Sequence, residues 1–504
     1  MSGLKRVLVA NRGEIALRII RGCHEEGIEA VAVYSDVDKT SPHVIEADAA
    51  VNIGPAQASQ SYLDIQKLLD AAKDSGADSI HPGYGFLAER AEFAAAVENA
   101  GLIFIGPPAS AISAMGDKTE ARRRMTDAGV PVIPGTVEPA ATTEDAVAAA
   151  REVGFPVLLK AAAGGGGKGM RRCESENEAA KLFEQASSEA QSAFGDGSVY
   201  IEKCIERPRH VEIQVLADSL GNVTHVGERE CSVQRRHQKL IEESPSPAVD
   251  VELRSAMGDA AVQAARTVGY RGAGTVEFLL VPDGSFYFLE MNTRLQVEHP
   301  ITELVYGLDL VREQLRIAAG ERLSFSDRML MPRGHSIECR ITAEDVFSGF
   351  LPATGRIEYL KAPSGPGVRW DGGIEAGSEI GLFYDSLLGK LIVWGENRER
   401  AIRRMSRALD EFVIVGVPTA IPFHRRVMHE PGFIAGDYDI EYIDRIGAEL
   451  LSPNMDEAEL ERLAVAAAIA EHERREAAYV VAHPSQPGKS DSGWLLAARR
   501  AGLR

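Results

Sequence analysis

The sequence contains little cysteine and no long apolar run. Its five cysteines are scattered over 504 residues without CxxC spacing, which favours free thiols in a reducing compartment and offers no zinc site. No apolar run approaches the roughly 20 residues of a membrane-spanning helix. The first residues, MSGLKRVLVA, lead from two basic side chains straight into an expected strand, without the apolar segment of a signal peptide. These absences predict a cytoplasmic protein that does not span a membrane.

An excess of positive charge is also absent. The chain has 55 Lys and Arg residues against 74 Asp and Glu residues, a net charge of −19, which argues against nucleic acid or an anionic membrane as a partner. An anionic small substrate remains compatible, because the basic residues cluster locally. A chain of 504 residues is too long for one core, so two to four domains are expected.

The first hundred residues alternate short apolar strands with helices. We expect strands at 5–10, 29–34, 77–80 and 101–105, separated by helices such as 13–26, 61–75 and 87–100. This alternation predicts a doubly wound parallel sheet. A nicotinamide-cofactor site with Asp36 as ribose ligand is only weakly supported, because the first turn, residues 10–14, has one glycine.

The chain changes character after Gly116. Pro131 and Pro134 mark a boundary, and Ser175 with Glu178 forms the capping box of a helix. Further helices are expected at 143–153, 398–412 and 455–479, and strands at 157–161, 170–173, 199–203, 210–217, 223–228, 335–342, 355–361 and 388–395. The middle and C-terminal parts are therefore expected to be richer in antiparallel strands.

The segment EMNTRLQVEH, residues 290–299, is the most informative part of the chain. With the two-residue period of a strand, its polar side chains share one face: Glu290, Asn292, Arg294, Gln296 and Glu298. A polar stripe is usually the solvated face of a strand. Here the same face carries Phe286 and Phe288 upstream, and a face that buries phenylalanines before presenting charged groups indicates a cleft.

A β-hairpin is expected over residues 276–291, with an Asp-Gly turn. If Val281 faces Phe286, Glu277 lies directly opposite Glu290. Opposed side chains have Cβ atoms about 5 Å apart, and like charges there are destabilising. The pair, with Asn292 as a third oxygen donor, predicts a Mg²⁺ or Mn²⁺ site. The alternative is that Arg294 or a lysine neutralises the two carboxylates.

A glycine-rich loop, residues 164–169, follows the expected strand that ends near Lys160. It satisfies neither the dinucleotide fingerprint nor the P-loop pattern, because no helix starts at Gly169 and no Ser or Thr follows Lys168. Backbone N–H groups of glycines can approach phosphate closely, so a flap over a triphosphate is favoured over a simple hinge.

Three further segments are less specific. Glu202 in YIEKCI is a candidate reader of an adenine edge. The basic run RRHQK, residues 235–239, is either an anion clamp or a solvated surface. The HPGYGF segment, residues 81–86, is either a loop over the active cleft or a tight turn.

Together these features resemble the ATP-grasp superfamily and, more narrowly, the biotin carboxylase subunit of biotin-dependent carboxylases. The motifs cover roughly residues 4–446 and are VLVANRGEIALRIIR (7–21), HPGYGFLAE (81–89), MGDK (115–118), KAAAGGGGKGM (160–170), ERECSVQRRHQK (228–239), EMNTRLQVEHPITE (290–303) and ECRITAED (338–345). So many motifs in one order make the resemblance specific.

The resemblance implies that ATP and bicarbonate form carboxyphosphate, which carboxylates biotin. It implies ATP contacts from Lys118, Lys160, Gly166, Gly167, Glu202, Lys203, Ile205, His210 and His237, with Glu277 and Glu290 reaching the nucleotide through Mg²⁺ or Mn²⁺ and Asn292 as a further metal ligand. It implies bicarbonate binding by Lys239, Arg294, Gln296 and the Val297 backbone. Glu298 would be the general base, Arg340 would stabilise the biotin enolate, and Tyr84 would lie near biotin.

The chain lacks the Met-Lys-Met site that carries biotin in longer relatives. The resemblance therefore implies a separate biotin carboxyl carrier protein, a separate carboxyltransferase and a homodimer. The expected reaction is the first half-reaction of an acyl-CoA carboxylase acting on acetyl-CoA, in fatty acid biosynthesis. The alternatives are the biotin carboxylase subunit of a two-subunit pyruvate carboxylase, another ATP-grasp carboxylate–amine ligase, and an inactive regulatory subunit.

The resemblance also implies the domain organisation of a multidomain α/β and α+β protein. We expect a Rossmann-like N-terminal domain over 1–115, an ATP-grasp domain over 116–331 with a mobile glycine-flap subdomain at about 131–203, and a β-rich C-terminal biotin carboxylase domain over 332–446. A helical tail over 447–504 either docks a partner or is an inert extension.

Overall fold

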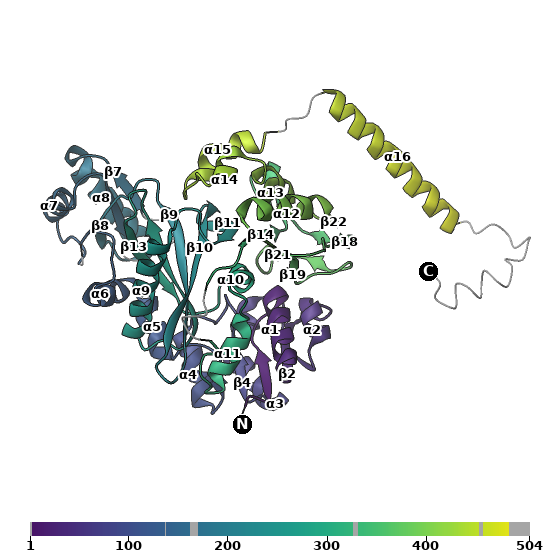
Figure 1. The fold of residues 1–504 in the computed structure, drawn as a ribbon, viewed down its shortest axis with the longest axis horizontal. Coiled ribbons are helices and arrows are strands. Elements are labelled where there is room, and N and C mark those ends of the chain that lie inside the picture. The colour runs from purple at the N-terminus through teal and green to yellow at the C-terminus, as the bar shows by residue number, and fades with distance from the viewer. Residues whose placement is uncertain (1–2, 137, 162–169, 326–330, 453–456, 483–504) are drawn as a thin grey trace, which may run out of the picture. The chain divides into compact units, whose positions relative to one another are not determined.

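The computed structural model describes residues 3–136, 138–161, 170–325, 331–452 and 457–482 (Figure 1). The chain divides into two compact units, Met1–Leu451 and Ser452–Arg504. In the second unit, α16 (Glu457–Ala482) confirms the helix expected at 455–479. None of the helices within these described ranges is both long and apolar enough to cross a bilayer. All five cysteines are buried free thiols, as their spacing predicted.

The N-terminal part is a five-stranded parallel sheet in the order β3-β2-β1-β4-β5. Its strands are β1 (Arg6–Val9), β2 (Glu29–Ser35), β3 (Ala49–Gly54), β4 (Ser79–His81) and β5 (Ile103–Phe104), and its helices are α1 (Gly13–Glu25), α2 (Pro42–Glu46), α3 (Ile65–Ser75), α4 (Ala91–Asn99) and α5 (Ala109–Gly116). The predicted doubly wound sheet is confirmed. Strand β3 was not predicted, because this edge strand is largely exposed and lacks the apolar run of its neighbours.

A small three-stranded sheet, β7-β6-β8, lies with two helices in a lobe of its own (Figure 1). It comprises α7 (Thr143–Val153), β6 (Val157–Ala161), β7 (Met170–Cys173), α8 (Glu176–Phe194) and β8 (Val199–Lys203). The predicted capping box is confirmed at the start of α8, where Ser175 and Glu178 bond reciprocally. The glycine-rich loop, with Gly166 and Gly167, lies outside the described residues.

The largest sheet has eight strands in the order β13-β12-β9-β10-β11-β14-β21-β19. They are β9 (Arg209–Ala217), β10 (Val223–Arg235), β11 (Gln238–Ser244), β12 (Gly272–Leu280), β13 (Phe286–Asn292), β14 (His335–Thr342), β19 (Val368–Gly372) and β21 (Leu387–Gly395). This eight-stranded sheet joins strands from both sides of residue 331, so the middle and C-terminal parts of the chain share one framework.

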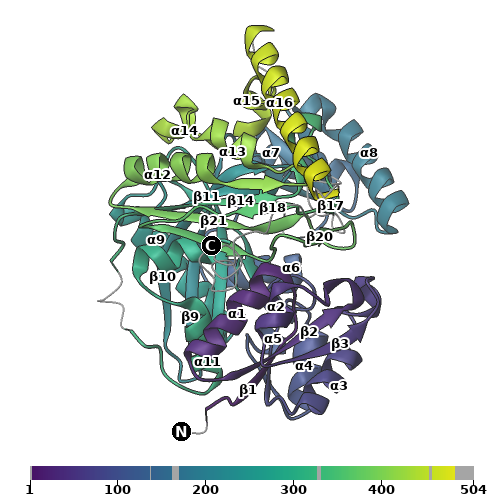
Figure 2. The same ribbon diagram turned by 90° about the vertical axis from the view of Figure 1, so that its right-hand side faces the viewer.

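Helices pack on β14 and its neighbours, and Figure 2 shows α12 alongside β14 and β21. Helix α12 (Arg398–Glu411) packs on β14 and β21, and its buried side chains form one apolar cluster with Ile337, Cys339 and Ile341 of β14. Helix α10 (His299–Tyr306) contacts β10, β11, β14 and β21. Because side chains alternate along a strand, Glu338 and Arg340 of β14 point away from the α12 cluster, toward the α10 face.

The remaining elements complete the first unit. The helices are α6 (Lys118–Asp127), α9 (Val251–Thr267), α11 (Leu310–Ala318), α13 (Ile421–Val427), α14 (Pro431–Ala435) and α15 (Tyr442–Leu450), with short 3₁₀ turns at Asp36–Asp38, Ala58–Gln60 and Val346–Ser348. The short strands are β15 (Glu344–Asp345), β16 (Leu351–Pro352), β17 (Gly355–Arg356), β18 (Tyr359–Lys361), β20 (Glu379–Ile380) and β22 (Val413–Val415). The strand expected at 355–361 is thus divided between β17 and β18.

The predicted hairpin forms, although its register differs from the prediction near the turn. Glu277 pairs with Glu290, as expected, but Phe286 pairs with Leu280 rather than Val281. A register shift between Glu277 and Phe278 restores the expected pairing beyond it, which is the effect of a β-bulge. The central pair is therefore confirmed, while the geometry assumed at the turn was wrong.

The polar stripe is a strand only in its first part. Strand β13 ends at Asn292, residues 293–298 form turns and irregular backbone, and α10 begins at His299 with Glu298 as its N-cap residue. The strand period predicted for Arg294, Gln296 and Glu298 is therefore wrong. The basic run spans the turn between β10 and β11, with Arg236 and His237 at φ of 50° and 64°.

Candidate active site

A largely buried lysine, Lys239 of β11, lies at the centre of a cluster of acidic side chains. Its Nζ bonds Glu212 Oε2 at 2.6 Å, Glu277 Oε1 at 2.9 Å and Glu298 Oε1 at 2.7 Å. These carboxylates come from β9, β12 and the start of α10. Burial alone would lower the pKa of Lys239, but the three carboxylates raise it well above its usual value. The amine is therefore a permanent cation.

Glu298 is completely buried and lies between two cations. Besides Lys239, it accepts a 3.0 Å bond from Arg340 Nη2, and Arg340 Nε donates to Glu242 Oε1 at 2.6 Å. Burial alone would raise the pKa of Glu298, but Lys239, Arg340 and Arg229 hold it well below its usual value. The carboxylate is therefore ionised, and its second oxygen is shared with the guanidinium of Arg340.

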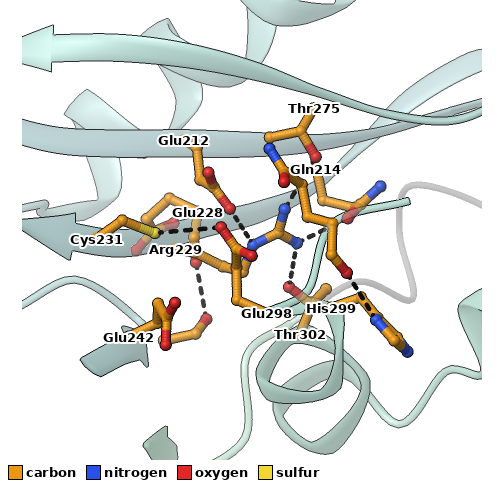
Figure 3. Close-up of polar contacts among 12 residues, drawn as sticks. Glu212, Gln214, Glu228, Arg229, Cys231, Glu242, Thr275, Glu298, His299 and Thr302 are labelled. Atoms are coloured by element: carbon orange, nitrogen blue, oxygen red, sulfur yellow. Dashed lines mark hydrogen bonds and ion pairs between the residues drawn. The ribbon is translucent and has the colours of Figure 1, made fainter. Parts of the chain in front are cut away.

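A buried arginine that the sequence analysis did not single out organises this cluster (Figure 3). Arg229 of β10 has no exposed surface and donates to Glu212, Gln214, Thr275 and Thr302. It thereby joins β9, β10 and β12 to α10. Its presence inside the ERECSVQRRHQK motif was the available signal, but an arginine in a charged segment normally indicates a surface.

The opposed acids Glu277 and Glu290 are brought together as predicted, with different surroundings. Glu277 is engaged by Lys239 and by His210 Nε2 at 2.9 Å, and these cations hold its pKa below the usual range despite burial. Burial and the negative charge of Glu277 raise the pKa of Glu290, although part of its side chain reaches solvent. The alternative that a lysine neutralises the two carboxylates thus applies to Glu277, which pairs with Lys239, and not to Glu290.

Among the described residues, Glu290 makes no ion pair. Besides burial, the charge of Glu277 raises its pKa, whereas Lys118, His210 and Lys239 lower it. Asn292 Oδ1 accepts from Arg294 Nη2 at 3.1 Å. Two carboxylates and an amide oxygen on neighbouring strands fit a hard divalent cation. Two other groups of described residues also have ligand atoms within 4.8 Å of one another: His210, Glu212 and Glu277, and Glu212, Cys231 and Glu298.

The residues predicted for bicarbonate lie along one path. Arg294 donates to Gln296 Oε1 at 2.7 Å, and Gln296 Nε2 donates to Glu277 Oε1 at 3.1 Å. Arg294 Nε also bonds Glu89 Oε2 at 2.8 Å. Glu89 ends the HPGYGFLAE motif but was not assigned a role from sequence, because its contact spans 205 residues. The guanidinium is thus held by groups from two parts of the chain.

A second unassigned residue, Lys390 of β21, links this path to the biotin residue implied by the resemblance. Lys390 is fully buried and donates to the Val297 carbonyl at 2.9 Å. It also pairs with Glu14 at 3.1 Å, and Glu14 accepts from the Tyr84 hydroxyl. A lysine inside the apolar run LLGKLIVW was the sequence signal, because such a lysine is buried only where it finds partners.

The residues predicted for the nucleotide fall into two groups. In the small sheet, Glu202 pairs with Lys160 and with Arg122, while Lys203 Nζ donates to the carbonyls of Gly154 and Phe155. Ile205 lies two residues beyond the end of β8. In the eight-stranded sheet, His210 contacts Glu277, and His237 lies exposed in the β10–β11 turn. Lys118 begins α6.

Comparison with known proteins gives matches over most of the chain. Three family models match: "Biotin carboxylase, N-terminal domain" over residues 3–112, "Carbamoyl-phosphate synthase L chain, ATP binding domain" over 117–326, and "Biotin carboxylase C-terminal domain" over 338–445. The chloroplastic biotin carboxylase of Arabidopsis thaliana is 54% identical over 452 residues, 90% of this chain and 84% of that protein. The biotin carboxylase of Nostoc sp. is 53% identical over 88% of this chain and 99% of that protein.

Solved structures agree. The biotin carboxylase of Campylobacter jejuni, in a complex with a βγ-ATP ligand, superposes with a TM-score of 0.83 at 48% identity, covering 88% of this chain and 99% of that chain. The biotin carboxylase domain dimer of Hydrogenobacter thermophilus 2-oxoglutarate carboxylase, with MgADP, ADP and bicarbonate, gives 0.83 at 46% identity and covers 90% and 100%. The resemblance read from the motifs is confirmed: this chain belongs to the biotin carboxylase family of ATP-grasp ligases.

Proposed function

We propose that this chain uses ATP and bicarbonate to carboxylate biotin on a separate carrier protein, as the first half-reaction of an acetyl-CoA carboxylase. The observation that carries the proposal is Glu298, a fully buried, ionised carboxylate that lies between Lys239 and Arg340. The neighbouring carboxylate pair Glu277 and Glu290 supports it. Glu298 is a buried base between two cationic side chains, and it lies next to the proposed metal site. This arrangement suits an anionic substrate that must lose a proton beside ATP.

The nucleotide is proposed to bind between the small sheet and the eight-stranded sheet. Its contacts would be Lys118, Lys160, Gly166, Gly167, Glu202, Lys203, Ile205, His210 and His237. Glu277, Glu290 and Asn292 would hold Mg²⁺ or Mn²⁺, which supplies charge compensation to the phosphates. The raised pKa of Glu290 supports this, because a divalent cation would relieve the repulsion from Glu277.

Bicarbonate is proposed to bind Lys239, Arg294, Gln296 and the Val297 backbone, within reach of Glu298. Lys239 and Arg340 weaken Glu298 as a base, but the same cations stabilise the dianion that bicarbonate becomes on losing its proton. The proton therefore passes from bicarbonate to Glu298, and the positive charges of Lys239 and Arg340 act on both anions. The bicarbonate oxygen attacks the γ-phosphorus, ADP leaves, and carboxyphosphate forms.

Carboxyphosphate then breaks into CO₂ and phosphate, the phosphate takes the proton of the ureido nitrogen of biotin, and the enolate so formed adds to the CO₂ through that nitrogen. Arg340 would stabilise the resulting enolate before addition, since its planar guanidinium carries a permanent charge. Tyr84 would border the biotin ring. It reaches the Val297 carbonyl through Glu14 and Lys390, which supports a biotin site adjoining the bicarbonate site.

The partners proposed are a biotin carboxyl carrier protein and a carboxyltransferase, with the chain itself a cytoplasmic homodimer. The proposed domains are 1–115, 116–331, 332–446 and a tail over 447–504, and the ranges of the three matching family models support the first three. A second candidate is the corresponding component of a two-subunit pyruvate carboxylase. It is favoured by a pyruvate carboxylase subunit of Methanothermobacter thermautotrophicus, which is 53% identical over 87% of this chain.

The proposed base is tested with Glu298→Gln, compared with the exposed control Glu399→Gln. Bicarbonate-dependent ATP cleavage should fall by about 10²-fold or more, while nucleotide binding measured by calorimetry stays unchanged. Cleavage at the wild-type rate, or loss of nucleotide binding, would contradict the role. The acceptor is identified by assaying the complex that co-purifies with the chain for fixation of labelled bicarbonate into acetyl-CoA or pyruvate.

A further inference from the structure

A second pair of opposed acids lies on the α10 face of the eight-stranded sheet, apart from the cation pair. Glu242 of β11 and Glu338 of β14 are directly paired across neighbouring antiparallel strands. Their Cβ atoms are thus about 5 Å apart, where two like charges repel. Neither side chain has exposed surface. Glu277 is paired with Lys239. In contrast, no lysine of the described chain lies within hydrogen-bonding distance of Glu242 or Glu338.

The hydrogen bonds of this pair are incomplete. Glu242 Oε1 accepts from Arg340 Nε at 2.6 Å, whereas Glu242 Oε2 and both oxygens of Glu338 have no hydrogen-bond partner among the described residues. An ionised carboxylate can only accept hydrogen bonds, and a protonated one also donates. If the two facing carboxyls share one proton, a strong O–H···O⁻ bond engages one unpartnered oxygen of each acid.

The groups that face Glu338 decide which acid carries this proton. They are Glu242 on β11, Arg340 on β14, Lys390 on β21 and Glu298 at the start of α10. Lys390 is engaged by Glu14 and the Val297 carbonyl, and burial holds the pKa of His299 well below its usual value, so that it is neutral. On the opposite face, helix α12 contributes the apolar and alanine side chains of the core together with Arg398, which pairs with Glu243.

Arg340 is bonded to Glu242 and not to Glu338, so the ionised member is Glu242. In agreement with this, burial and the charges of Glu242 and Glu298 raise the pKa of Glu338 well above its usual value, against the opposing effects of Lys390 and Arg340. The pKa of Glu242 rises less, to about 7, because Arg340 favours its charged form.

We propose that Glu338 is a neutral, proton-bearing positioning residue, whose hydroxyl donates to Glu242 and thereby fixes the carboxylate that orients Arg340. The resulting chain runs from Glu338 through Glu242 and Arg340 to Glu298. It holds the guanidinium at two edges, through Nε and Nη2, as an orienting acid holds the base of a catalytic triad. No proton is transferred in this role, and Glu338 touches no substrate.

The role rests on the proposed function, because Arg340 is assigned there to biotin. Glu338→Gln is isosteric and keeps a donor for Glu242, so biotin- and bicarbonate-dependent ATP cleavage should stay within about twofold of wild type at pH 7. The wild-type rate should fall at alkaline pH as Glu338 loses its proton, and Glu338→Gln should remove that fall. Glu338→Met has no donor, so its rate should drop about tenfold or more and its KM for biotin should rise.

Equal losses in Glu338→Gln and Glu338→Met, full activity in Glu338→Met, or an alkaline limb retained in Glu338→Gln would overturn the proposal. A second measurement is independent of activity. Infrared spectra of the wild-type protein and of Glu338→Gln are recorded at pH 8 and subtracted. The difference should show the carbonyl stretch of a protonated carboxyl in the wild-type protein that is missing in Glu338→Gln. Absence of this band from the wild-type protein would refute the shared proton. If the wild-type protein shows no biotin-dependent ATP cleavage, the proposed function fails, but the infrared result still tests whether Glu338 and Glu242 share a proton.

Discussion

Replacing Glu243 by glutamine should destabilise the eight-stranded sheet by an amount that depends on pH. Glu243 follows Glu242 on β11 and points to the α12 face. It accepts from His335 Nε2 at 2.5 Å, from Arg398 Nε at 2.7 Å and from the Tyr438 hydroxyl. Burial alone would raise the pKa of Glu243, but His335 and Arg398 lower it from 4.5 to about 2.

The shift of about 2.5 pH units corresponds to about 3 kcal/mol, since one unit is about 1.4 kcal/mol. The folded-state pKa of Glu243 is depressed, so this stability is present above pH 4.5 and is lost as the pH falls toward 2. Glu243→Gln should therefore lower the free energy of unfolding by about 3 kcal/mol at pH 7, and the difference should narrow below pH 4.5. Breaking a buried ion pair typically costs about 3–5 kcal/mol.

Urea unfolding followed by tryptophan fluorescence tests this value. Two of the three tryptophans, Trp370 and Trp394, lie in β19 and β21 of the same sheet, and a Trp494→Phe background removes the third. Glu399→Gln is the matched control, because its ion pair with Arg403 is exposed and worth about 0.5 kcal/mol or less. A Glu243→Gln effect below about 1 kcal/mol at pH 7, or one that stays constant down to pH 3.5, would refute the reasoning.

Two further changes test the active site. Lys239→Met leaves Glu212, Glu277 and Glu298 without their shared cation, so bicarbonate-dependent ATP cleavage should fall at least about 10²-fold, and a wild-type rate in a steady-state assay would contradict the arrangement. Glu290→Ala removes the carboxylate opposite Glu277, so the Mg²⁺ concentration for half-maximal activity should rise about tenfold or more. An unchanged requirement in a magnesium titration would count against the proposed cation pair.

The fold was predictable where one residue pattern determines one local structure. The central residues of β1 and β2 are apolar on both faces, which is what a buried parallel strand requires. The capping box at Ser175 and Glu178 fixed the start of α8 for a local reason. Strand β3 escaped prediction because pairing with β2 and not burial holds it in place, and pairing with a distant strand leaves no local pattern.

The sequence indicated which residues could form the candidate site, but it predicted their positions and contacts less well. The Glu277–Glu290 pairing was correct because the bulge compensated for the wrong turn register, and a bulge is not visible in alternation. Glu298 was placed on a strand, yet it occupies the N-cap position of α10. Lys239 was assigned to bicarbonate, but its three carboxylates lie 27 to 59 residues away, so only the completed sheet reveals them.

Strand β11 shows how the sheet separates stability from chemistry. On the α12 face, Glu243 has cations and a hydroxyl for its oxygens, so its charge stabilises the fold. On the α10 face, Glu242 faces another acid and shares Arg340 with Glu298, so its charge is costly to bury. Such a cost is accepted where a fixed field serves a reaction. Substitutions on the α12 face should therefore change stability first, and those on the α10 face should change activity and its pH dependence first.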